Sequence, residues 1–583
     1  MQGLFEDGAL VRNGTVRITR SLSQLRLPPT VQGMLAARID RLPRPQKELL
    51  QTLAVIGREA RLRLVREVTS GDEVGLSQNL ADLLAAEFIY EQPVAGDTEF
   101  VFKHALTQEV AYSSLLVERR KQLHERVGYS IETIFADKLD DHIDALGHQY
   151  SHSDNADKAI EYLSRAGQQA LRRSAHNHAI CNLNSAIERL GTLPDSPERK
   201  MREMSLQMML GPALIAFTGF GTTEVERNSA RARELCIALG DPPELFGVSY
   251  GAWNLRCMRA DMRAAKDAAL LLLARAEGMR DTAALEMAYG AMGATLFYMG
   301  EARLAAEHFR SALSLNDPDR PLAPVGLDLR VLHLFLLAWA LIHTGYPEQA
   351  LQSALEAVTR ARALSHPHSA AAADLYLATV RLLRREFDEA LKVSEQQFAL
   401  GSEYGLADVL AAAIGIRGTV LASRGHEEGI PLIEQRVASG RKTGLKMLRP
   451  QELCWLAEAY IAFNQFDKAS EPLDEALTIA ESDGARYWEA ETHCLRGELL
   501  LRKSGSNRVE AETCFERATE VARQQGTRWW ELRATVSLAR LLASQGRREE
   551  ARVMLSEIYN WFTEGFDTAD LKDAKALLEE LSD

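Results

Sequence analysis

The sequence has little cysteine, little proline and no long apolar run. None of its six cysteines stands in a CxxC pair, which excludes a zinc ribbon and argues against a disulfide framework. The longest strongly apolar stretch, LFLLAWALI at 334–342, is much shorter than the roughly 20 residues that a membrane-spanning helix needs. The opening residues, MQGLFED, include acidic side chains where a signal peptide would be basic. We therefore expect a cytoplasmic protein without a membrane partner.

Charge is distributed unevenly along the chain, whose 583 residues carry a net charge of −13. Residues 1–130 hold 17 Lys and Arg against 16 Asp and Glu, whereas residues 131–583 hold 51 against 65. An acidic surface repels phosphate backbones, so nucleic acid is not expected as a partner of the second part. The densest basic run, Arg119-Arg120-Lys121, lies in the first part and is diluted by Glu118 and Glu125.

A period of about forty residues runs through the second part of the chain. One copy consists of Tyr289, Met292, Gly293, Leu296, Gly300, Ala305, Phe309 and Ala312, followed by Pro318. This spacing resembles the tetratricopeptide repeat (TPR), in which small residues let two antiparallel helices approach closely. The position of Ala305 recurs at 350, 390, 430, 469, 511 and 551, at intervals of 39 to 45 residues. We therefore expect an all-α, TPR-like superhelical solenoid of about ten helix pairs. An irregular helical bundle is the alternative.

The N-terminal part has a different pattern. Helices are expected at 30–42 and 44–57, near 60–69 and at 73–87, followed by a hairpin within 88–102. A set of three helices followed by a hairpin is typical of a winged helix. We therefore interpret these segments as a small winged-helix module. A further hairpin with an Asn-Gly turn is expected at 11–20.

Three strings of this part resemble the STAND-type predicted ATPases of bacteria, which are AAA-related and often fused to class III adenylate or guanylate cyclases. The strings are LPPTVQGMLAARIDRLP (27–43), LLQTLAVIGRE (49–59) and FVFKHALTQEVAYSSLLVERRKQLHERV (100–127). The closing string WFTEGFDTADLKDAKALLEEL (561–581) resembles the same family. The resemblance implies three parts: a remnant of the ATPase module at 1–28, a winged-helix lid module at 29–135, and a TPR array at 136–583.

The chain departs from this family in lacking a GxxxxGK[ST] phosphate-binding loop. No acidic Walker-B strand is visible either. Residues 1–130 are too few to hold a cyclase domain. We therefore expect no enzyme activity and no cofactor in this chain. ATP or ADP with Mg is implied only for a nucleotide-binding domain that would act in cis or in trans. The expected function is a protein-interaction and signal-sensing scaffold, the regulatory half of such a signalling protein. An ATP-binding enzyme in a full-length context and a winged-helix transcriptional regulator are the alternatives.

Histidines provide the candidate ligand-binding positions. By the family resemblance, His104 would contact the phosphate of bound ADP; the alternative is a histidine that packs at a helix start. His148 and His152 lie one helical turn apart, a spacing at which two imidazoles can share a metal, with His142 nearby. No catalytic carboxylate accompanies them, so we interpret this segment as a solvated helix face and expect no metal site.

Tryptophans provide the candidate partner-binding positions. Trp488, Trp529 and Trp530 each stand at the start of a repeat's first helix, the helix that lines the groove of a TPR array. They are expected to anchor a protein or peptide in that groove, and helix–helix core is the alternative role. No Ser-His-Asp or Cys-His arrangement can be argued, so no catalytic residue is expected.

Overall fold

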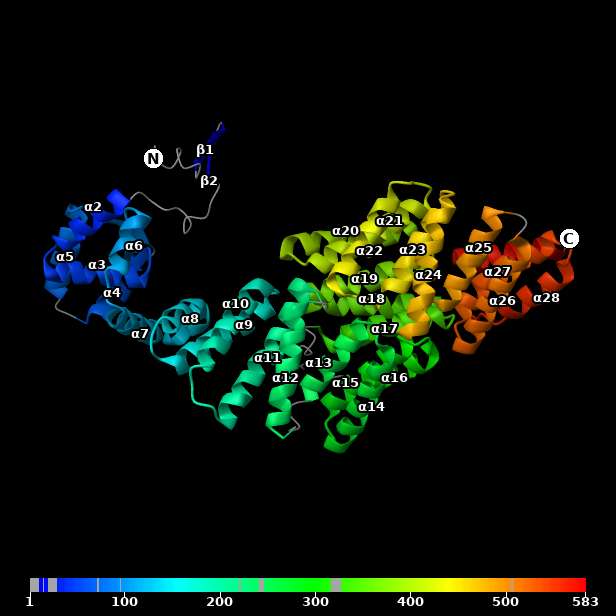
Figure 1. Cartoon of the computed structure of the whole chain (residues 1–583), viewed down its shortest axis with the longest axis horizontal. Coiled ribbons are helices and arrows are strands. Elements are labelled where there is room, and N and C mark those ends of the chain that lie inside the picture. The colour runs from blue at the N-terminus through cyan, green and yellow to red at the C-terminus, as the bar shows by residue number, and fades with distance from the viewer. Residues whose placement is uncertain are drawn as a thin grey trace. The chain divides into compact units, whose positions relative to one another are not determined.

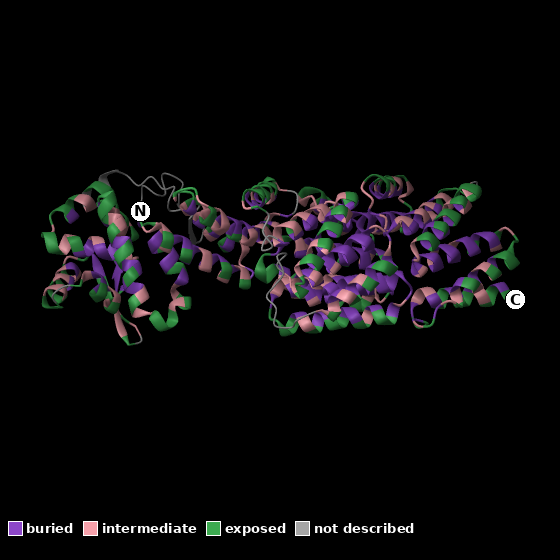
Figure 2. Cartoon of the chain, turned by 90° about the horizontal axis from the view of Figure 1, so that it is seen from below, coloured by how far each residue is buried: buried purple, intermediate pink, exposed green. Residues whose placement is uncertain are grey.

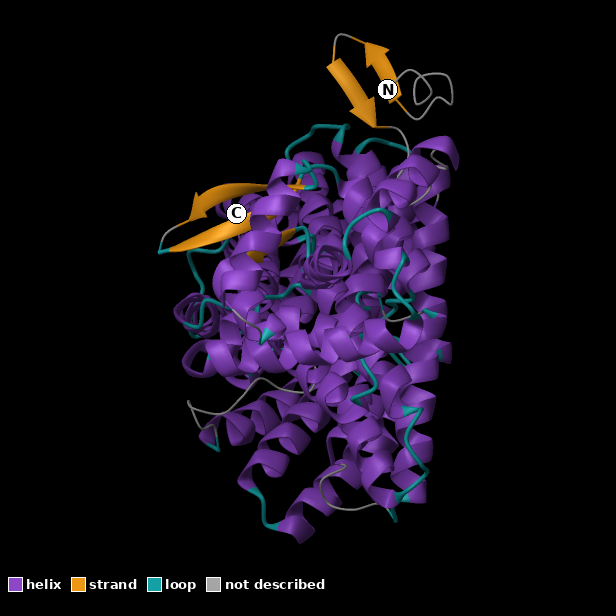
Figure 3. Cartoon of the chain, turned by 90° about the vertical axis from the view of Figure 1, so that its left-hand side faces the viewer, coloured by secondary structure: helices purple, strands orange, loops and turns teal. Residues whose placement is uncertain are grey.

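Helices dominate the structure, and the strands of the described residues all lie in its N-terminal part (Figure 3). The computed structural model describes residues 10–13, 15–18, 29–70, 73–94, 96–219, 222–240, 246–315, 327–504 and 507–582. The chain divides into two units: unit 1 comprises residues 1–166 and 184–194, and unit 2 comprises residues 167–183 and 195–583 (Figure 1). The predicted all-α repeat fold is confirmed.

Unit 1 begins with an isolated strand pair and continues as a mixed helix–strand module that leads into longer helices. Its elements are β1 (Leu10–Asn13), β2 (Thr15–Ile18), α2 (Pro29–Asp40), α3 (Arg44–Ile56), β3 (Glu59–Arg61), α4 (Leu62–Thr69), α5 (Glu73–Ala85), β4 (Ile89–Val94), β5 (Asp97–Phe102), α6 (Ala105–Ser113), α7 (Val117–Ile134), the 3-10 helix η2 (Ala136–His142) and α8 (Ile143–Ser151). The predicted hairpin at 11–20 is confirmed by the pairing of Leu10 with Ile18. The interpretation of residues 1–28 as an ATPase remnant lies mostly outside the described residues.

A three-stranded antiparallel sheet closes one side of unit 1. Its order is β3-β5-β4, with Ile89 opposite Phe102 and Glu59 opposite Val101. The predicted hairpin within 88–102 is therefore confirmed, and so are the four predicted helices, with one difference. The helix expected from about residue 60 begins at Leu62, because residues 59–61 pair with β5 and bury Ala60 in the sheet.

The core of this module lies between α3 and the sheet. Helix α3 buries Leu49, Leu50 and Leu53 on one face, the i, i+1, i+4 spacing of an amphipathic helix. These side chains belong to one cluster with Phe100 and Phe102 of β5. Helices α4 and α5 and the hairpin β4–β5 thus share one core with the central helix α3.

Two of the three boundaries between the units lie within helices α9 (Ala156–Arg172) and α10 (His176–Leu190), and the third follows α10. Unit 2 continues with α11 (Pro197–Thr218), α12 (Thr223–Ala238), α13 (Phe246–Met258), α14 (Met262–Met279), α15 (Thr282–Tyr298), α16 (Ala302–Ser314), α17 (Leu329–His343), α18 (Pro347–Ala363), α19 (Pro367–Leu383), α20 (Phe387–Tyr404), α21 (Ala407–Ser423), α22 (Gly429–Thr443), α23 (Arg449–Ala462), α24 (Phe466–Ser482), α25 (Glu489–Lys503), α26 (Arg508–Gln525), α27 (Arg528–Ser544), α28 (Arg548–Tyr559) and α29 (Ala569–Ser582). From α11 to α28 the helices pack in consecutive pairs.

The predicted repeat markers all lie in the second helices of these pairs. Six of them are the fourth residue of their helix and are alanines with no exposed surface; they are Ala305, Ala350, Ala390, Ala469, Ala511 and Ala551. The marker at 430 is Ile430, the second residue of α22, and it is also buried. The forty-residue period of the sequence is therefore the period of the helix pairs.

Glycine in a first helix makes room for a ring from the second helix. A Cβ atom at Gly293 would lie 2.8 Å from Cε1 of Phe309, and one at Gly497 would lie 2.6 Å from Cε1 of Phe515. Both rings are fully buried. Since real Cβ atoms do not approach a ring so closely, only glycine allows each helix pair to close on its phenylalanine.

Helices far apart in the sequence also meet inside unit 2. The amide of Arg486 donates to the carbonyl of Tyr298 at 2.8 Å, and that of Lys446 donates to the carbonyl of Met258 at 2.9 Å. Between α17 and α27, Nε1 of Trp530 donates to Nδ1 of His343 at 3.1 Å, across 187 residues of chain. The superhelix therefore closes on itself after about four pairs.

An aromatic cluster fills the interior at this closure. It consists of Phe297, Tyr298, Trp339, His343, Tyr487, Trp488 and Trp530, whose ring centroids lie 4.8 to 6.5 Å from their neighbours. All seven side chains are buried, and Figure 2 shows the buried residues concentrated in the helices of the array. First helices that would face a groove in an open array here face each other.

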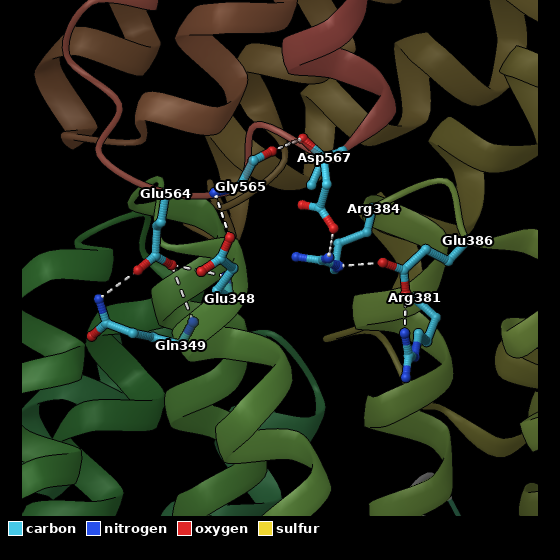
Figure 4. Close-up of polar contacts among 9 residues, drawn as sticks. Glu348, Gln349, Arg381, Arg384, Glu386, Glu564, Gly565 and Asp567 are labelled. Atoms are coloured by element: carbon cyan, nitrogen blue, oxygen red, sulfur yellow. Dashed lines mark hydrogen bonds and ion pairs between the residues drawn. The ribbon is translucent and has the colours of Figure 1, made fainter.

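The segment between α28 and α29, together with the first residues of α29, holds the last pairs against α17 and α18. We call these residues, 560–573, the clasp (Figure 4). Trp561 lies against Gly345, which has a φ of 95° and would place a Cβ atom 2.6 Å from the indole. Glu564 and Gly565 bond to the start of α18, and Asp567 approaches Arg384 at 3.5 Å. The motif-rich end of the sequence therefore has a structural role in closing the array.

Candidate functional site

Unit 2 contains a mostly apolar cavity of about 300 Å³, which we call the apolar cavity. It lies among α11, α12, α13, α15, α17, α19, α20, α21 and α22. Tyr298, Phe335 and Tyr376 line it, and the rings of Phe335 and Tyr376 stack at 3.8 Å. Its volume and apolar lining are within the range of ligand pockets.

Small residues leave this space open. The lining includes Gly211, Ala216, Gly247, Gly251, Ala252, Ala294, Ala372 and Ala412. A Cβ atom at Gly251 would have no described atom within 4 Å apart from its own helix and chain neighbours. The cavity thus follows from the same enrichment in small residues that the repeat period requires.

A few polar groups punctuate the apolar wall. Asn228 donates from Nδ2 to Oε1 of Gln207 at 2.7 Å. Oε1 of Gln397 and Oδ1 of Asp408 are buried without a hydrogen-bond partner in the described residues. Acceptors of this kind can orient a ligand that carries an N–H or O–H donor.

A second cavity of about 340 Å³ lies among α19, α21, α23, α25, α27 and α29, and it is polar; we call it the charged cavity. Nη2 of Arg533 lies 2.9 Å from Oε1 of Glu491 and 3.9 Å from Oε1 of Glu458. At the same cavity, Arg385 pairs with Asp573 at 2.8 Å. Burial raises the pKa of Glu491 to about 8, and it also raises those of Glu458 and Asp570.

His104 stands at the N-cap of α6, directly after β5, with an exposed side chain. Its imidazole makes no capping hydrogen bond with the described residues. The structure thus leaves the ring accessible, and the contact with a nucleotide phosphate stays a prediction.

His148 and His152 do lie close together, with ring centroids 4.5 Å apart, and His124 lies 5.0 Å from His152. His124 accepts or donates on both nitrogens: Nδ1 lies 2.6 Å from Oε1 of Gln149, and Nε2 lies 2.9 Å from the hydroxyl of Tyr112. Nδ1 of His152 lies 2.8 Å from the carbonyl of His148. In the part of the chain that is described, no group of His, Cys, Asp or Glu is arranged to hold a metal ion.

The basic run of α7 is engaged within unit 1. Arg120 lies over the ring of Tyr112 at 4.4 Å, and Lys121 pairs with Asp154 at 2.9 Å. Arg126 donates to the hydroxyl of Ser70 at 2.7 Å. Arg120 and Lys121 of the run, and Arg126 further along the same helix, therefore have partners inside the protein.

The three candidate tryptophans lie in the interior of the array. Trp529 and Trp530 have 0% and 1% of their surface exposed, which places them in the helix–helix core, the alternative role. Trp488, 3% exposed, also lines the charged cavity. Partner binding by these tryptophans stays a prediction. Of the three, Trp488 is the one that lines a cavity.

Apart from Trp488, the sequence interpretation did not select the residues of the two cavities. Glu491, Cys494 and Leu495 occupy one helical face, so a carboxylate on an otherwise apolar face was a readable signal. The apolar cavity had no comparable signal, because alanine and glycine also mark close helix packing.

Comparison with known proteins finds distant relatives. No known protein-family model matches the sequence. An uncharacterized protein of Rhizobium meliloti strain 1021 is 23% identical over 545 residues, which are 92% of this chain and 52% of that protein. The chain thus spans about half the length of this curated relative.

Several solved structures are similar to this chain at low sequence identity. A Rap protein complexed with competence and sporulation factor is 13% identical, with 67% of this chain and 99% of that one covered and a TM-score of 0.41. The STAND protein with a tetratricopeptide repeat sensor from Pyrococcus horikoshii is 14% identical, with 78% and 68% covered and a TM-score of 0.30. Yeast Tom70 is 15% identical, with 80% and 93% covered and a TM-score of 0.30.

None of the helices in the described residues is both long and apolar enough to cross a membrane.

Proposed function

We propose that this chain is a cytoplasmic protein-interaction and signal-sensing scaffold, in which the helical array binds a protein or peptide partner. We further propose that it is the regulatory part of a STAND-type ATPase signalling protein and performs no catalysis itself. In this proposal residues 29–135 form a winged-helix lid on a nucleotide-binding domain, supplied in cis or in trans.

The apolar cavity carries this proposal. It offers about 300 Å³ lined by aromatic and small side chains, together with a few buried acceptors. Burying the apolar side chain of a partner there would be favourable by roughly 1.5–3 kcal/mol for each large residue. An interaction scaffold needs a site of this kind, and it needs no catalytic group.

The element order of unit 1 supports the lid. Helix α3, strand β3, helices α4 and α5 and the hairpin β4–β5 follow one another, with β5 between β3 and β4. This order of elements is the one expected of a winged helix, which supports the proposal. The ring of His104, which follows the hairpin, is exposed, and this accessibility supports the proposed contact with a nucleotide phosphate.

The cavity is tested by blocking it. Gly251 lines it, and Gly278 of α14 does not; neither has a described atom within 4 Å of its Cβ position beyond its own helix and chain neighbours. We expect the neutral apolar dye N-phenylnaphthylamine to fluoresce with the natural chain and with Gly278→Trp, and to lose most of its signal with Gly251→Trp. Equal fluorescence of the two variants would remove the cavity as the binding site.

Catalytic independence is tested by calorimetric titration of the chain with Mg-ATP and with ADP. We expect no binding up to about millimolar nucleotide, which means a binding free energy no more favourable than roughly −4 kcal/mol. Micromolar binding would replace the scaffold by a nucleotide-binding enzyme.

A further inference from the structure

The charged cavity has a buried acceptor that its own partners leave free. The carboxylate of Glu491, in α25, is 2% exposed, and its Oε1 forms an ion pair with Nη2 of Arg533 at 2.9 Å. Its other oxygen, Oε2, has no hydrogen-bond partner among the described residues, and neither has Oδ2 of Asp570. A buried carboxylate oxygen without a donor is costly, so a ligand that supplies a donor there gains affinity.

Acidic groups outnumber basic ones in the interior of this cavity. Five carboxylates line it: Glu458, Glu491, Glu498, Asp570 and Asp573. Of its four arginines, Arg385, Arg502 and Arg540 are exposed, and Arg385 is paired with Asp573, which is exposed as well. Arg533 is the one arginine of the lining that is not exposed, and it is paired with Glu491. The free acceptors and the excess of acid both favour a cation over an anion.

Two indoles complete the lining. Trp455 is half-buried, and its ring lies 6.1 Å from that of Trp488 at an angle of 87°. Both tryptophans belong to the cavity wall. The face of an indole attracts an organic cation, and it also contacts the alkyl chain that carries the charge.

We propose that the charged cavity binds an organic cation, a guanidinium or ammonium group on an alkyl chain, which donates to Oε2 of Glu491 and lies against Trp455 and Trp488. The cation is either a small free molecule or the side chain of a basic residue in a partner peptide. This site is separate from the apolar cavity, so its test does not depend on the function proposed above.

Ligand binding at this site releases a proton near neutral pH. Burial raises the pKa of Glu491 to about 8, with Arg533 opposing this and Glu458, Glu498 and Asp570 adding to it. A bound cation favours the ionised carboxylate and lowers that pKa. Affinity therefore rises with pH up to about 8, by at most about tenfold per pH unit.

The test is calorimetric titration of the whole chain with butylguanidinium and with butylurea, its neutral isostere. We expect binding of the first only, with a proton released at pH 7, which is measured by repeating the titration in buffers of different ionisation enthalpy. No heat up to about 10 mM probe, or equal binding of butylurea, would overturn the proposal. This measurement needs no variant, so a folding defect cannot obscure it.

The residue is tested by Glu491→Gln, which keeps the shape of the side chain and an acceptor for Arg533. We expect butylguanidinium to bind this variant at least about tenfold more weakly and without proton release. Glu557→Gln, which removes an exposed carboxylate from α28, is the matched control and should bind as the natural chain does. Unchanged affinity and proton release in Glu491→Gln would overturn the assignment.

The source of the cation is distinguished with acetyl-Ala-Arg-Ala-amide and its citrulline counterpart. Tighter binding of the arginine peptide than of butylguanidinium supports a basic peptide side chain. Weaker binding of the peptide supports a small free cation. Equal binding of the citrulline peptide contradicts the proposal.

Discussion

Glu564 and Glu348 cap each other across the closure of the array (Figure 4). Oε1 of Glu564 accepts from the backbone amide of Glu348 at 2.8 Å, and Oε1 of Glu348 accepts from the amide of Gly565 at 3.0 Å. The first bond satisfies an amide at the start of α18, where an anion also meets the positive end of the helix dipole. A capping box usually joins residues three apart; here it joins residues more than two hundred apart.

The clasp predicts a capping contribution from Glu564. We expect Glu564→Ala to lower the free energy of unfolding by about 1 kcal/mol, the usual effect of losing an N-cap side chain. Glu564→Gln retains an acceptor and should lose less. Urea unfolding measures both. Glu557→Ala, on the exposed face of α28, should stay within about 0.5 kcal/mol of the natural chain, and a loss as large as that of Glu564→Ala would contradict the capping role.

Gly497 should tolerate no larger residue. A Cβ atom there would lie 2.6 Å from the buried ring of Phe515, so Gly497→Ala is expected to destabilise the chain by about 1–3 kcal/mol. In a chain that already carries Phe515→Leu, Gly497→Ala should lower the free energy of unfolding by less than it does in the natural chain. A double-mutant cycle measures this difference. Strict additivity of the two changes would show that the ring is not the cause.

Replacing Gly251 by alanine should stabilise the protein, in contrast to the same change at Gly497. Gly251 lies inside α13 with open space at its Cβ position, and glycine within a helix costs about 0.5–1 kcal/mol relative to alanine. Gly251→Ala should therefore raise the free energy of unfolding by up to about 1 kcal/mol, measured by thermal and urea unfolding. A destabilised variant would mean that the wall of the apolar cavity is closed at this point.

Acid should destabilise unit 2 through His343. Its ring is 2% exposed, and burial lowers its pKa from about 6.5 to about 3. Between these values the unfolded chain binds a proton that the folded chain does not, so stability is complete above about pH 6.5 and is lost as the pH falls. The loss attributable to this group is up to about 1.4 kcal/mol per pH unit.

His343→Gln isolates this term, because glutamine keeps an acceptor for the indole of Trp530 and does not titrate. Urea unfolding between pH 7 and pH 4 should give a shallower dependence for the variant than for the natural chain. Parallel curves would assign the acid sensitivity to other groups.

The repeat period was predictable because it depends on local contacts. Ala305 and the five other marker alanines are buried in second helices, each of which packs against the first helix just before it in the sequence. The same holds for the strand pairing of Ile89 with Phe102, which a short turn fixes. Local geometry leaves a periodic trace that can be recognised in one sequence.

The closure was not predictable in this way. Nothing in the sequence says that His343 meets Trp530, because the angle between successive pairs sets that register. The same angle decides whether Trp529 and Trp530 face a groove or a core, and aromatic residues suit both. Glu491 was overlooked because a carboxylate in an acidic, helix-rich chain is usually exposed.

The closed superhelix changes how this array should respond to a mechanical load. In an open solenoid each repeat touches only its neighbours, so pulling on the ends peels repeats off one at a time. Here α17 is held by α18 and also by α27, far along the chain. Extension must break the clasp and the aromatic interior before the pairs that they join are released. Under force, the closed array should therefore unfold in one large step and not pair by pair.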